Sequence, residues 1–287
     1  MKIIRYTPAL AAQWDEWVRA SRNGTFLFLR GYMDYHADRF TDHSLIITDD
    51  DDAWMAILPA NSKDNSYVSH GGLTYGGLVF ADSTSATLAL PILTAVCRYL
   101  RDIGFSSLVY KAVPYIYHRQ PSDDDLYALF RLNATLSVRN LSTAINLTDP
   151  IPSSRLGKRA LKRQRRYNIE VSETDTCTSF WDIVIEDRRV RHNVRPVHTA
   201  AELDYLKSKC PDNIKFYTAR HGEQILGGAV IYLDRGVIHL QYAACTPEGK
   251  DMYATDVIYH DLIFNRLKGN RYFDFGISNE YSRRYIN

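Results

Sequence analysis

The predicted secondary-structure elements of this chain recur in the same order in two places, and this repeat constrains the fold more than any other feature. Residues 44–113 show the pattern of a hairpin, a third strand, a glycine-rich turn, a long helix and a closing strand. Residues 214–277 show the same pattern, with a helix of similar length. We therefore predict an α+β protein in which one unit, a mixed and mostly antiparallel sheet flanked by helices, is present twice.

The boundary between the two halves is predicted at Asp149-Pro150-Ile151-Pro152, where two prolines interrupt regular structure. The break gives an N-terminal domain of residues 1–149 and a C-terminal domain of residues 150–287. The second domain opens with a basic helix that links the halves. We expect a substrate cleft along the seam between the two copies.

Composition narrows the class of protein. The 287 residues are 45% apolar and 24% charged, which excludes a disordered or collagen-like chain. The most apolar stretch, residues 86–100, contains Pro91 and Arg98, so no membrane span is predicted. The first residues lack the apolar core of a signal peptide, and we expect a cytoplasmic protein. Four widely separated cysteines give neither a disulfide framework nor a zinc spacing, so no metal is predicted.

Positive charge is concentrated in one short segment. The net charge is +2, yet residues 155–166 hold seven basic residues and no acidic one, so the remainder is net acidic. Four of the basic residues share one face at helical spacing: Arg155, Arg159, Lys162 and Arg166. Phosphate groups of a substrate would neutralise this face, whereas a solvated linker helix is the alternative. No aromatic residue is interleaved before Tyr167, which disfavours nucleic acid as the partner.

Several short stretches strengthen the pattern of elements. They are Thr74-Tyr75-Gly76-Gly77, residues 110–118, the basic helix, Pro196-Val197-His198-Thr199, Gln241-Tyr242-Ala243-Ala244 and residues 272–278. With them, nearly the whole chain resembles the GNAT acyltransferase superfamily, specifically the tandem-domain branch that includes the Fem-type peptidoglycan-bridge aminoacyltransferases. The resemblance implies two GNAT-like domains and acyl transfer, with a cell-envelope precursor as one class of acceptor.

The resemblance also implies a donor. In this superfamily an acyl thioester of coenzyme A lies between the fourth and fifth strands, and its pyrophosphate binds where the next helix begins. Acetyl-coenzyme A is therefore the first donor expected, with Gln241 and Gly249 matching the family's loop. The loop departs from the family pattern because Pro247 lacks an N–H and because Glu248 and Asp251 are acidic.

Two further departures concern the size of the chain. Fem-type enzymes use aminoacyl-tRNA and insert a helical arm between their halves, but residues 150–200 contain no heptads, which argues against a large RNA donor. The superfamily fold ends with another strand hairpin, and only ten residues follow residue 277. We therefore expect this hairpin to be missing and the sheet edge to be open or covered by a partner, for example in a homodimer.

Acyl transfer to an amine needs a base and groups that stabilise the developing oxyanion. Asp274 alternates with two phenylalanines, so its carboxylate faces away from them. His239 shares a face with Gln241 by the two-residue period, and His198 lies in a loop before a helix capped by Thr199. The candidate catalytic residues are Asp274, His198 and His239; local structural roles are the alternative for each.

A second set of residues is expected to bind substrate. Gly76 and Gly77 allow close approach of the backbone to a ligand, or else form a bulge between strands. Lys111 follows a strand and either binds a phosphate or carboxylate or extends to solvent. The candidate substrate-binding residues are Tyr75, Gly76, Gly77, Lys111, Tyr115, His118, Gln241 and Tyr242.

The function expected from these features is N-acyl transfer from a small donor, acetyl-coenzyme A first, to an amine on a phosphorylated or nucleotide-linked sugar. A Fem-like transferase that uses aminoacyl-tRNA is one alternative. A non-catalytic protein that binds an anionic glycan or nucleic acid is the other. The sequence contains neither a Gly-x-Ser-x-Gly nor a His-Glu-x-x-His motif, so a serine hydrolase or zinc protease has no support.

Overall fold

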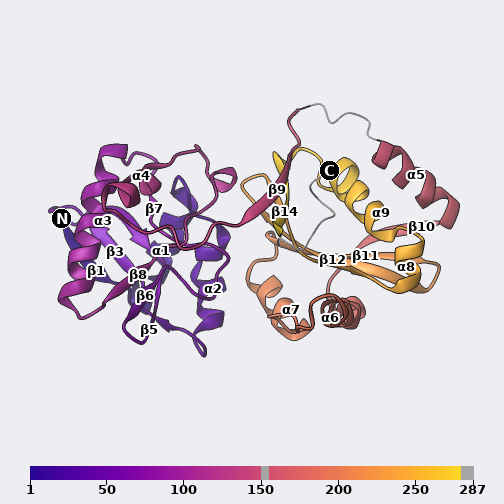
Figure 1. Cartoon of the computed structure of the whole chain (residues 1–287), viewed down its shortest axis with the longest axis horizontal. Coiled ribbons are helices and arrows are strands. Elements are labelled where there is room, and N and C mark those ends of the chain that lie inside the picture. The colour runs from indigo at the N-terminus through magenta and orange to yellow at the C-terminus, as the bar shows by residue number, and fades with distance from the viewer. Residues whose placement is uncertain (150–154, 279–287) are drawn as a thin grey trace. The chain divides into compact units, whose positions relative to one another are not determined.

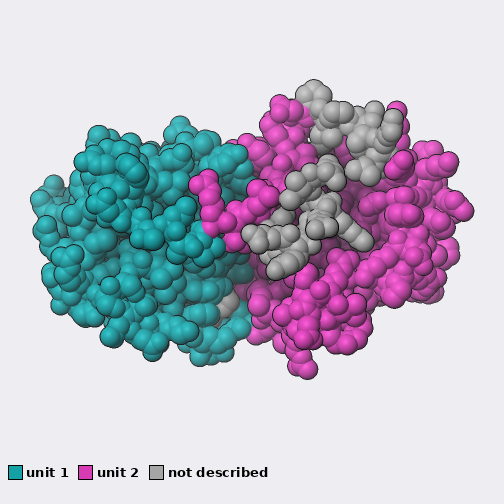
Figure 2. All heavy atoms as spheres, in the orientation of Figure 1, with its two compact units in different colours: residues 1–138 teal, residues 139–287 magenta. Residues whose placement is uncertain are grey.

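A computed structural model describes residues 1–149 and 155–278, except for the side chains of residues 36, 155, 156 and 278. The chain divides into two compact units, unit 1 (Met1–Val138) and unit 2 (Arg139–Asn287), which are coloured separately in Figure 2. This division lies eleven residues before the boundary predicted at 149/150. It differs because the strand that precedes the proline-rich break pairs within unit 2.

Unit 1 contains short strands, two longer helices and several helical turns. Its strands are β1 (Lys2–Arg5), β2 (Thr41–Asp42), β3 (Leu45–Thr48), β4 (Trp54–Leu58), β5 (Asn61–Lys63), β6 (Ser66–Val68), β7 (Val79–Phe80) and β8 (Ser107–Val109). Its helices are α1 (Ala11–Ala20), α2 (Arg30–Met33), α3 (Ala86–Asp102) and α4 (Asp124–Arg131), with 3-10 turns at Pro8–Leu10, Phe26–Phe28, Asp34–His36 and Tyr115–Tyr117.

The strands of unit 1 form two four-stranded sheets, in the orders β1-β3-β4-β7 and β2-β5-β6-β8. Two strands of one sheet continue into two strands of the other, because only two residues separate β2 from β3 and only two separate β4 from β5. A backbone hydrogen bond from His43 to Ala60 bridges the two breaks at 2.9 Å. The underlying order is therefore β1, β2/β3, β4/β5, β6 and β8, with the final pair parallel.

Unit 2 is built on one six-stranded sheet. Its strands are β9 (Leu141–Asn146), β10 (Ile169–Thr174), β11 (Ile214–His221), β12 (Gln224–Asp234), β13 (Val237–Cys245) and β14 (Tyr272–Ser278). Its helices are α5 (Arg155–Tyr167), α6 (Thr178–His192), α7 (Ala200–Lys209), α8 (Pro247–Asp251) and α9 (Ala254–Asp261), continued by a π-helical turn at Leu262–Arg266. Within this unit, α6 and α7 lie on one side of the sheet, and α5 and α9 lie on the other (Figure 1).

The sheet of unit 2 has the order β10-β11-β12-β13-β14-β9, and only β13 and β14 pair in parallel. Its first five strands reproduce the order and directions of the strands in unit 1. The predicted repeat of one unit is therefore confirmed at the level of topology. The helical segment after β13 is divided into α8 and α9, because Tyr253 between them adopts a left-handed conformation (φ 60°).

The edge of the second sheet is not open, and what covers it is not a partner chain. The predicted absence of a last hairpin concerns residues 279–287, which lie outside the described residues. Strand β9 pairs antiparallel with β14, with Tyr272 opposite Asn146 and Ser278 opposite Leu141. The edge of β14 is thus covered by a segment from earlier in the same chain.

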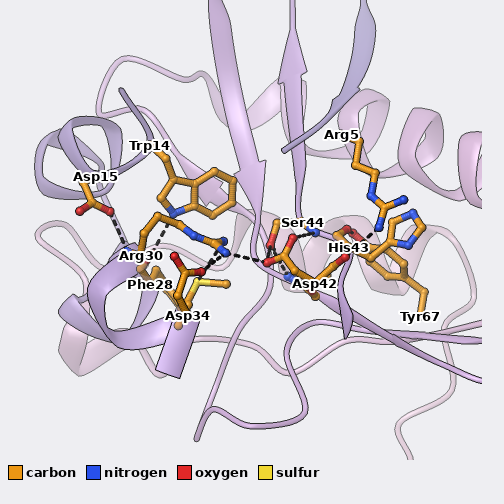
Figure 3. Close-up of polar contacts among 12 residues, drawn as sticks. Arg5, Trp14, Asp15, Phe28, Arg30, Asp34, Asp42, His43, Ser44 and Tyr67 are labelled. Carbon is orange, nitrogen blue, oxygen red and sulfur yellow. Dashed lines mark hydrogen bonds and ion pairs between the residues drawn. The ribbon is translucent and has the colours of Figure 1, made fainter. Parts of the chain in front are cut away.

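The helical segment at the start of unit 1 is tied to its sheet by a buried ion cluster (Figure 3). Arg30 is 5% exposed and contacts Asp34 and Asp42, the latter at 3.0 Å. Its guanidinium lies 3.9 Å from the centre of the Tyr6 ring. Burial alone would lower the pKa of Arg30, but the two carboxylates outweigh it and raise that pKa. The cluster links α2 to β2 and the first strand, which is a structural role.

Candidate active site

The parallel ladder ends differently in the two units. In unit 1 its three rungs are Ser66↔Ser107, Tyr67↔Leu108 and Val68↔Val109. In unit 2 the three rungs are Val237↔Tyr272, Ile238↔Phe273 and His239↔Asp274. Beyond this last rung β13 continues to Cys245, paired with β12 alone. The third rung, where the two strands stop pairing, holds two valines in unit 1 and a titratable pair in unit 2.

His239 and Asp274 form a buried hydrogen-bonded pair. His239 Nδ1 lies 2.9 Å from Asp274 Oδ2, and the two side chains are 14% and 7% exposed. The other oxygen, Oδ1, accepts the backbone N–H of Gly276 at 2.9 Å. Ser142 Oγ of β9 lies 3.0 Å from Oδ1 and 3.0 Å from the Gly276 carbonyl oxygen. The carboxylate is therefore fixed by groups from both neighbouring strands and from its own.

This geometry determines which nitrogen of His239 is free. A carboxylate only accepts hydrogen bonds, so Nδ1 carries a proton, and in the neutral imidazole the lone pair is on Nε2. Among the described residues, none forms a hydrogen bond with Nε2. An imidazole held by a carboxylate through Nδ1, with Nε2 unoccupied, is the arrangement of a general base.

A β-bulge determines which residues of β13 lie on the same face of the sheet as His239. The register between β12 and β13 shifts so that Tyr242 pairs with Val230 and Leu240 with Ile231, which leaves Gln241 without a partner in β12. The alternation predicted to put Gln241 on the face of His239 is therefore interrupted. Since Val230 and Tyr232 share a face and Tyr232 pairs with His239, Tyr242 lies on the His239 face.

Tyr242 is the centre of a second cluster on this face. His198 Nδ1 lies 2.9 Å from its hydroxyl, and the Trp181 ring packs edge-on at 5.1 Å. His198 is held just before α7, where Thr199 and Glu202 form a capping box. Burial raises the pKa of Tyr242, and the charge of Arg188 opposes that rise only in part. Tyr242 is therefore a neutral phenol at pH 7.

The candidate residues of unit 1 make contacts within the unit. Gly76 donates its N–H to Lys111 at 2.7 Å, and a Cβ at Gly76 would lie 1.8 Å from the Ser69 carbonyl oxygen. A Cβ at Gly77 would lie 2.6 Å from the Tyr110 ring. The Lys111 ammonium donates to the carbonyl oxygens of His70, at 3.0 Å, and Leu73. These glycines and this lysine close the loop over the end of the parallel ladder.

The remaining predicted residues of unit 1 are two tyrosines and a histidine. Tyr75 is buried and packs on Phe28 and Tyr117. His118 is buried, with Nε2 3.1 Å from the Val113 carbonyl oxygen, and burial lowers its pKa. Tyr115 is 59% exposed. The structure thus brings the predicted residues together as two separate groups, one in each unit.

The basic helix forms as predicted, as α5. Arg159, Lys162 and Arg166 are exposed, and none of them makes an ion pair with a described residue. The side chain of Arg155, the fourth predicted member, lies outside the described residues. Arg163, by contrast, pairs with Asp256 at 2.7 Å and lies over the Tyr253 ring. Arg163 fastens α5 to α9 and leaves the other cations to solvent.

The residues where α8 begins do not fit the pyrophosphate of coenzyme A. The Gly249 N–H donates to Thr246 Oγ1 at 3.0 Å, and Pro247 has no N–H. The Glu248 carboxylate accepts a hydrogen bond from Gln224, which places negative charge at this end. A Cβ at Gly249 would lie 2.2 Å from the Leu226 carbonyl oxygen, so this glycine serves packing against β12. No cradle of free N–H groups is left for a diphosphate at these residues.

Sequence reasoning did not identify Ser142, Gly276, Trp181 or Arg188. Gly276 adopts a φ of 75°, and a Cβ there would lie 3.4 Å from His239 Cε1. Ser142 joins the site through a strand pairing that the sequence does not show. The position of Gly276, two residues after Asp274, was the one available signal.

Two absences can be stated for the described part of the chain. There, no helix combines the length and apolar composition needed to cross a bilayer. Over the same residues, no group of three or more His, Cys, Asp or Glu side chains is placed to hold a metal ion.

Comparison with known proteins agrees with the topology. Residues 153–285 match the family model described as Acetyltransferase (GNAT) domain. None of the curated proteins matches the sequence significantly. A crystal structure of FemX has a TM-score of 0.64 at 11% identity, with 99% of this chain and 92% of that chain covered.

Two further solved structures are similar at comparable identity. The C-terminal domain of a lysylphosphatidylglycerol synthetase from Agrobacterium fabrum has a TM-score of 0.52 at 13% identity, covering 93% of this chain and 79% of that one. A tandem GNAT protein from the clavulanic acid biosynthesis pathway has a TM-score of 0.53 at 10% identity, covering 98% and 90%. The chain therefore shares the fold of FemX and of the tandem GNAT protein, and its residues 153–285 match the GNAT domain model.

Proposed function

We propose that unit 2 transfers an acyl group to an amine, with His239 as the general base. The observation that carries the proposal is the His239–Asp274 pair on the last rung of the parallel ladder, with Nε2 free of any described partner. Unit 1 has the same topology but valines on that rung. The chemistry is therefore assigned to unit 2.

In the proposed reaction, Nε2 of His239 takes a proton from the acceptor amine as its nitrogen attacks the acyl carbon. The C–N bond forms, the bond from the acyl carbon to the leaving group breaks, and the imidazolium returns the proton to the leaving oxygen or sulfur. Asp274 stabilises the imidazolium, and Ser142 and Gly276 keep Asp274 oriented. A positioned base of this kind contributes roughly 10²–10⁴-fold to the rate.

The donor is proposed to be an aminoacyl ester in preference to a coenzyme A thioester. The contacts of Thr246, Pro247 and Glu248 favour this choice, because they leave no phosphate cradle at α8. The names FemX and lysylphosphatidylglycerol synthetase are consistent with it, since the latter denotes an aminoacylated product. The described residues contain no inserted helical arm of the kind expected for tRNA binding. This does not argue against an aminoacyl ester as donor, because the chain covers 92% of FemX without such an arm.

The acceptor is proposed to be an amine on a phosphorylated or nucleotide-linked sugar. The exposed cations of α5, Arg159, Lys162 and Arg166, support an anionic substrate.

Donor and acceptor are tested together with the full chain. Acetyl-coenzyme A, longer acyl-coenzyme A species and charged tRNA are each incubated with glucosamine 6-phosphate or a UDP-linked amino sugar, and amide products are identified by mass spectrometry. We expect product from charged tRNA and none with the His239→Gln variant. Product with only acyl-coenzyme A would overturn the choice of donor. Equal turnover by wild type and His239→Gln would overturn the proposal itself.

The exposed cations of α5 also support a second function, a non-catalytic protein that binds an anionic glycan or nucleic acid. Such binding weakens steeply with salt, because it depends on counterion release. Saturable heparin or RNA binding with a steep salt dependence, and no amide product from any donor, would favour this alternative.

A further inference from the structure

Three arginines on α6, Arg188, Arg189 and Arg191, differ in whether a carboxylate of the same helix pairs with them. Arg189 forms two hydrogen bonds with Glu186, at 2.8 and 2.7 Å, and Arg191 lies 3.0 Å from Asp187. Arg188, which directly precedes Arg189, makes no hydrogen bond or ion pair with any described residue. A guanidinium carries five donors and stays charged at every physiological pH. The charge of Arg188 is thus available, whereas the charges of its neighbours are used within the helix.

The surroundings of Arg188 connect it to the active-site face. Its side chain is half-buried, and its guanidinium carbon lies 5.7 Å from the centre of the Tyr242 ring. The Trp181 ring packs against the same tyrosine. Removing a cation partly from water without a counter-ion costs free energy, which a bound anion would recover. Arg188 lies over an aromatic ring and has no ion-pair partner among the described residues, so its planar donors are open to a phosphate or carboxylate.

The distance along β13 relates this arginine to the base. Tyr242 and His239 lie on the same face, three residues apart, which limits their Cα separation to about 10 Å. Arg188, which lies over the Tyr242 ring, is therefore on the same side of the sheet as His239.

We propose that Arg188 is a specificity residue that binds an oxyanion, phosphate or carboxylate, on the acceptor substrate. The part of this proposal that concerns the acceptor rests on the proposed transferase function. Anion binding itself does not, so the two are tested separately.

The binding test uses pyrophosphate and citrate as probes, titrated into the full chain by calorimetry at constant low ionic strength. Arg188→Gln is compared with Arg189→Gln and Arg191→Gln, variants of the two internally paired arginines of the same helix. We expect the affinity for at least one probe to fall tenfold or more in Arg188→Gln and to change less than twofold in the other two. An equal loss in all three variants, or no loss in Arg188→Gln, overturns the proposal. Preference for pyrophosphate or citrate distinguishes phosphate from carboxylate.

The kinetic test uses the donor and acceptor that give product with the wild type. Arg188→Lys keeps the charge but loses the planar fork. We expect the KM for the acceptor to rise about tenfold with kcat changed less than threefold, whereas Arg189→Lys leaves both unchanged. A fall in kcat with no change in KM would overturn the role in binding. If no product forms with any donor, the proposed function fails, and the calorimetric result still decides whether Arg188 binds anions.

Discussion

The two units share a topology and differ at the end of the parallel ladder. In unit 1, Val68 and Val109 form the last rung, and the loop beyond it is closed by Lys111 and Gly76. In unit 2, His239 and Asp274 form the same rung, and β13 continues without pairing to β14. One copy of the fold has two apolar side chains at this point, and the other has a hydrogen-bonded histidine–aspartate pair. The comparison shows that the repeat explains the architecture but not the chemistry.

The strongest test of this difference replaces the two residues on the last rung of the parallel ladder in unit 2. His239→Gln and Asp274→Asn are each expected to lower kcat by about 10²–10⁴-fold, because the first removes the base and the second stops the carboxylate from accepting and stabilising the imidazolium. Melting temperature is expected to change little in His239→Gln. Val109→Ala, at the matching and 45% exposed position of unit 1, serves as the control and keeps full activity. Comparable losses in the control and the active-site variants would contradict the assignment to unit 2.

Substitution of one glycine in each unit tests whether tight packing closes the loop beyond the parallel ladder of unit 1. Gly76→Ala is expected to destabilise unit 1 by about 3 kcal/mol or more, since its Cβ would overlap the Ser69 carbonyl oxygen. Gly276→Ala is expected to cost only about 1–2 kcal/mol, for its left-handed backbone. Urea unfolding followed by tryptophan fluorescence measures both. A milder effect of Gly76→Ala than of Gly276→Ala would show that the loop of unit 1 is not closed by packing.

Ser142 tests whether the orientation of Asp274 matters. Ser142→Ala removes a hydroxyl that lies 3.0 Å from the carboxylate. We expect kcat to fall about tenfold, which corresponds to ~1.4 kcal/mol, with KM unchanged. Ser142→Thr, which keeps the hydroxyl, should restore most of the activity. If Ser142→Ala shifts only the melting temperature, the serine is structural.

The smallest expected effect is a pH dependence in unit 1. Burial lowers the pKa of His118, so the unfolded chain binds a proton more readily than the folded one below about pH 6.5. Stability is therefore lost as pH falls, and protonation would also break the hydrogen bond from the Ser122 N–H to Nδ1. The free energy of unfolding of the wild type and of His118→Gln is measured at pH 7.5 and at pH 5.5. We expect the decline between these values to be smaller in the variant than in the wild type, by about 1 kcal/mol or less. An identical decline in both proteins would contradict this role.

Much of the fold could be predicted because local patterns decide it. The repeat of elements predicted two similar sheets. Pairings between distant segments were not predictable. Strand β9 looks like the last strand of the first half, but it pairs with β14, more than 120 residues later. Neither strand contains a local signal of its partner.

The site was predicted in part for the same reason. His239 and Asp274 were identified from strand alternation, whereas the bulge at Gln241 reversed the alternation beyond it and put Tyr242 on their face. Ser142 lies outside residues 153–285, the segment that matches the family model. Gly76 and Gly77 were correctly seen as constrained, but the constraint comes from Ser69 and Tyr110 inside the unit.

The contact between Ser142 and Asp274 spans 132 residues and has a consequence for biosynthesis. Contacts so distant in sequence form late, because a long loop must close before they are made. Residue 276 has to leave the ribosome before the Asp274 carboxylate can form its hydrogen bonds with both Ser142 and Gly276. A nascent chain that has completed unit 1 therefore still lacks the oriented His239–Asp274 pair, which can form only after the last strand of unit 2 has been made.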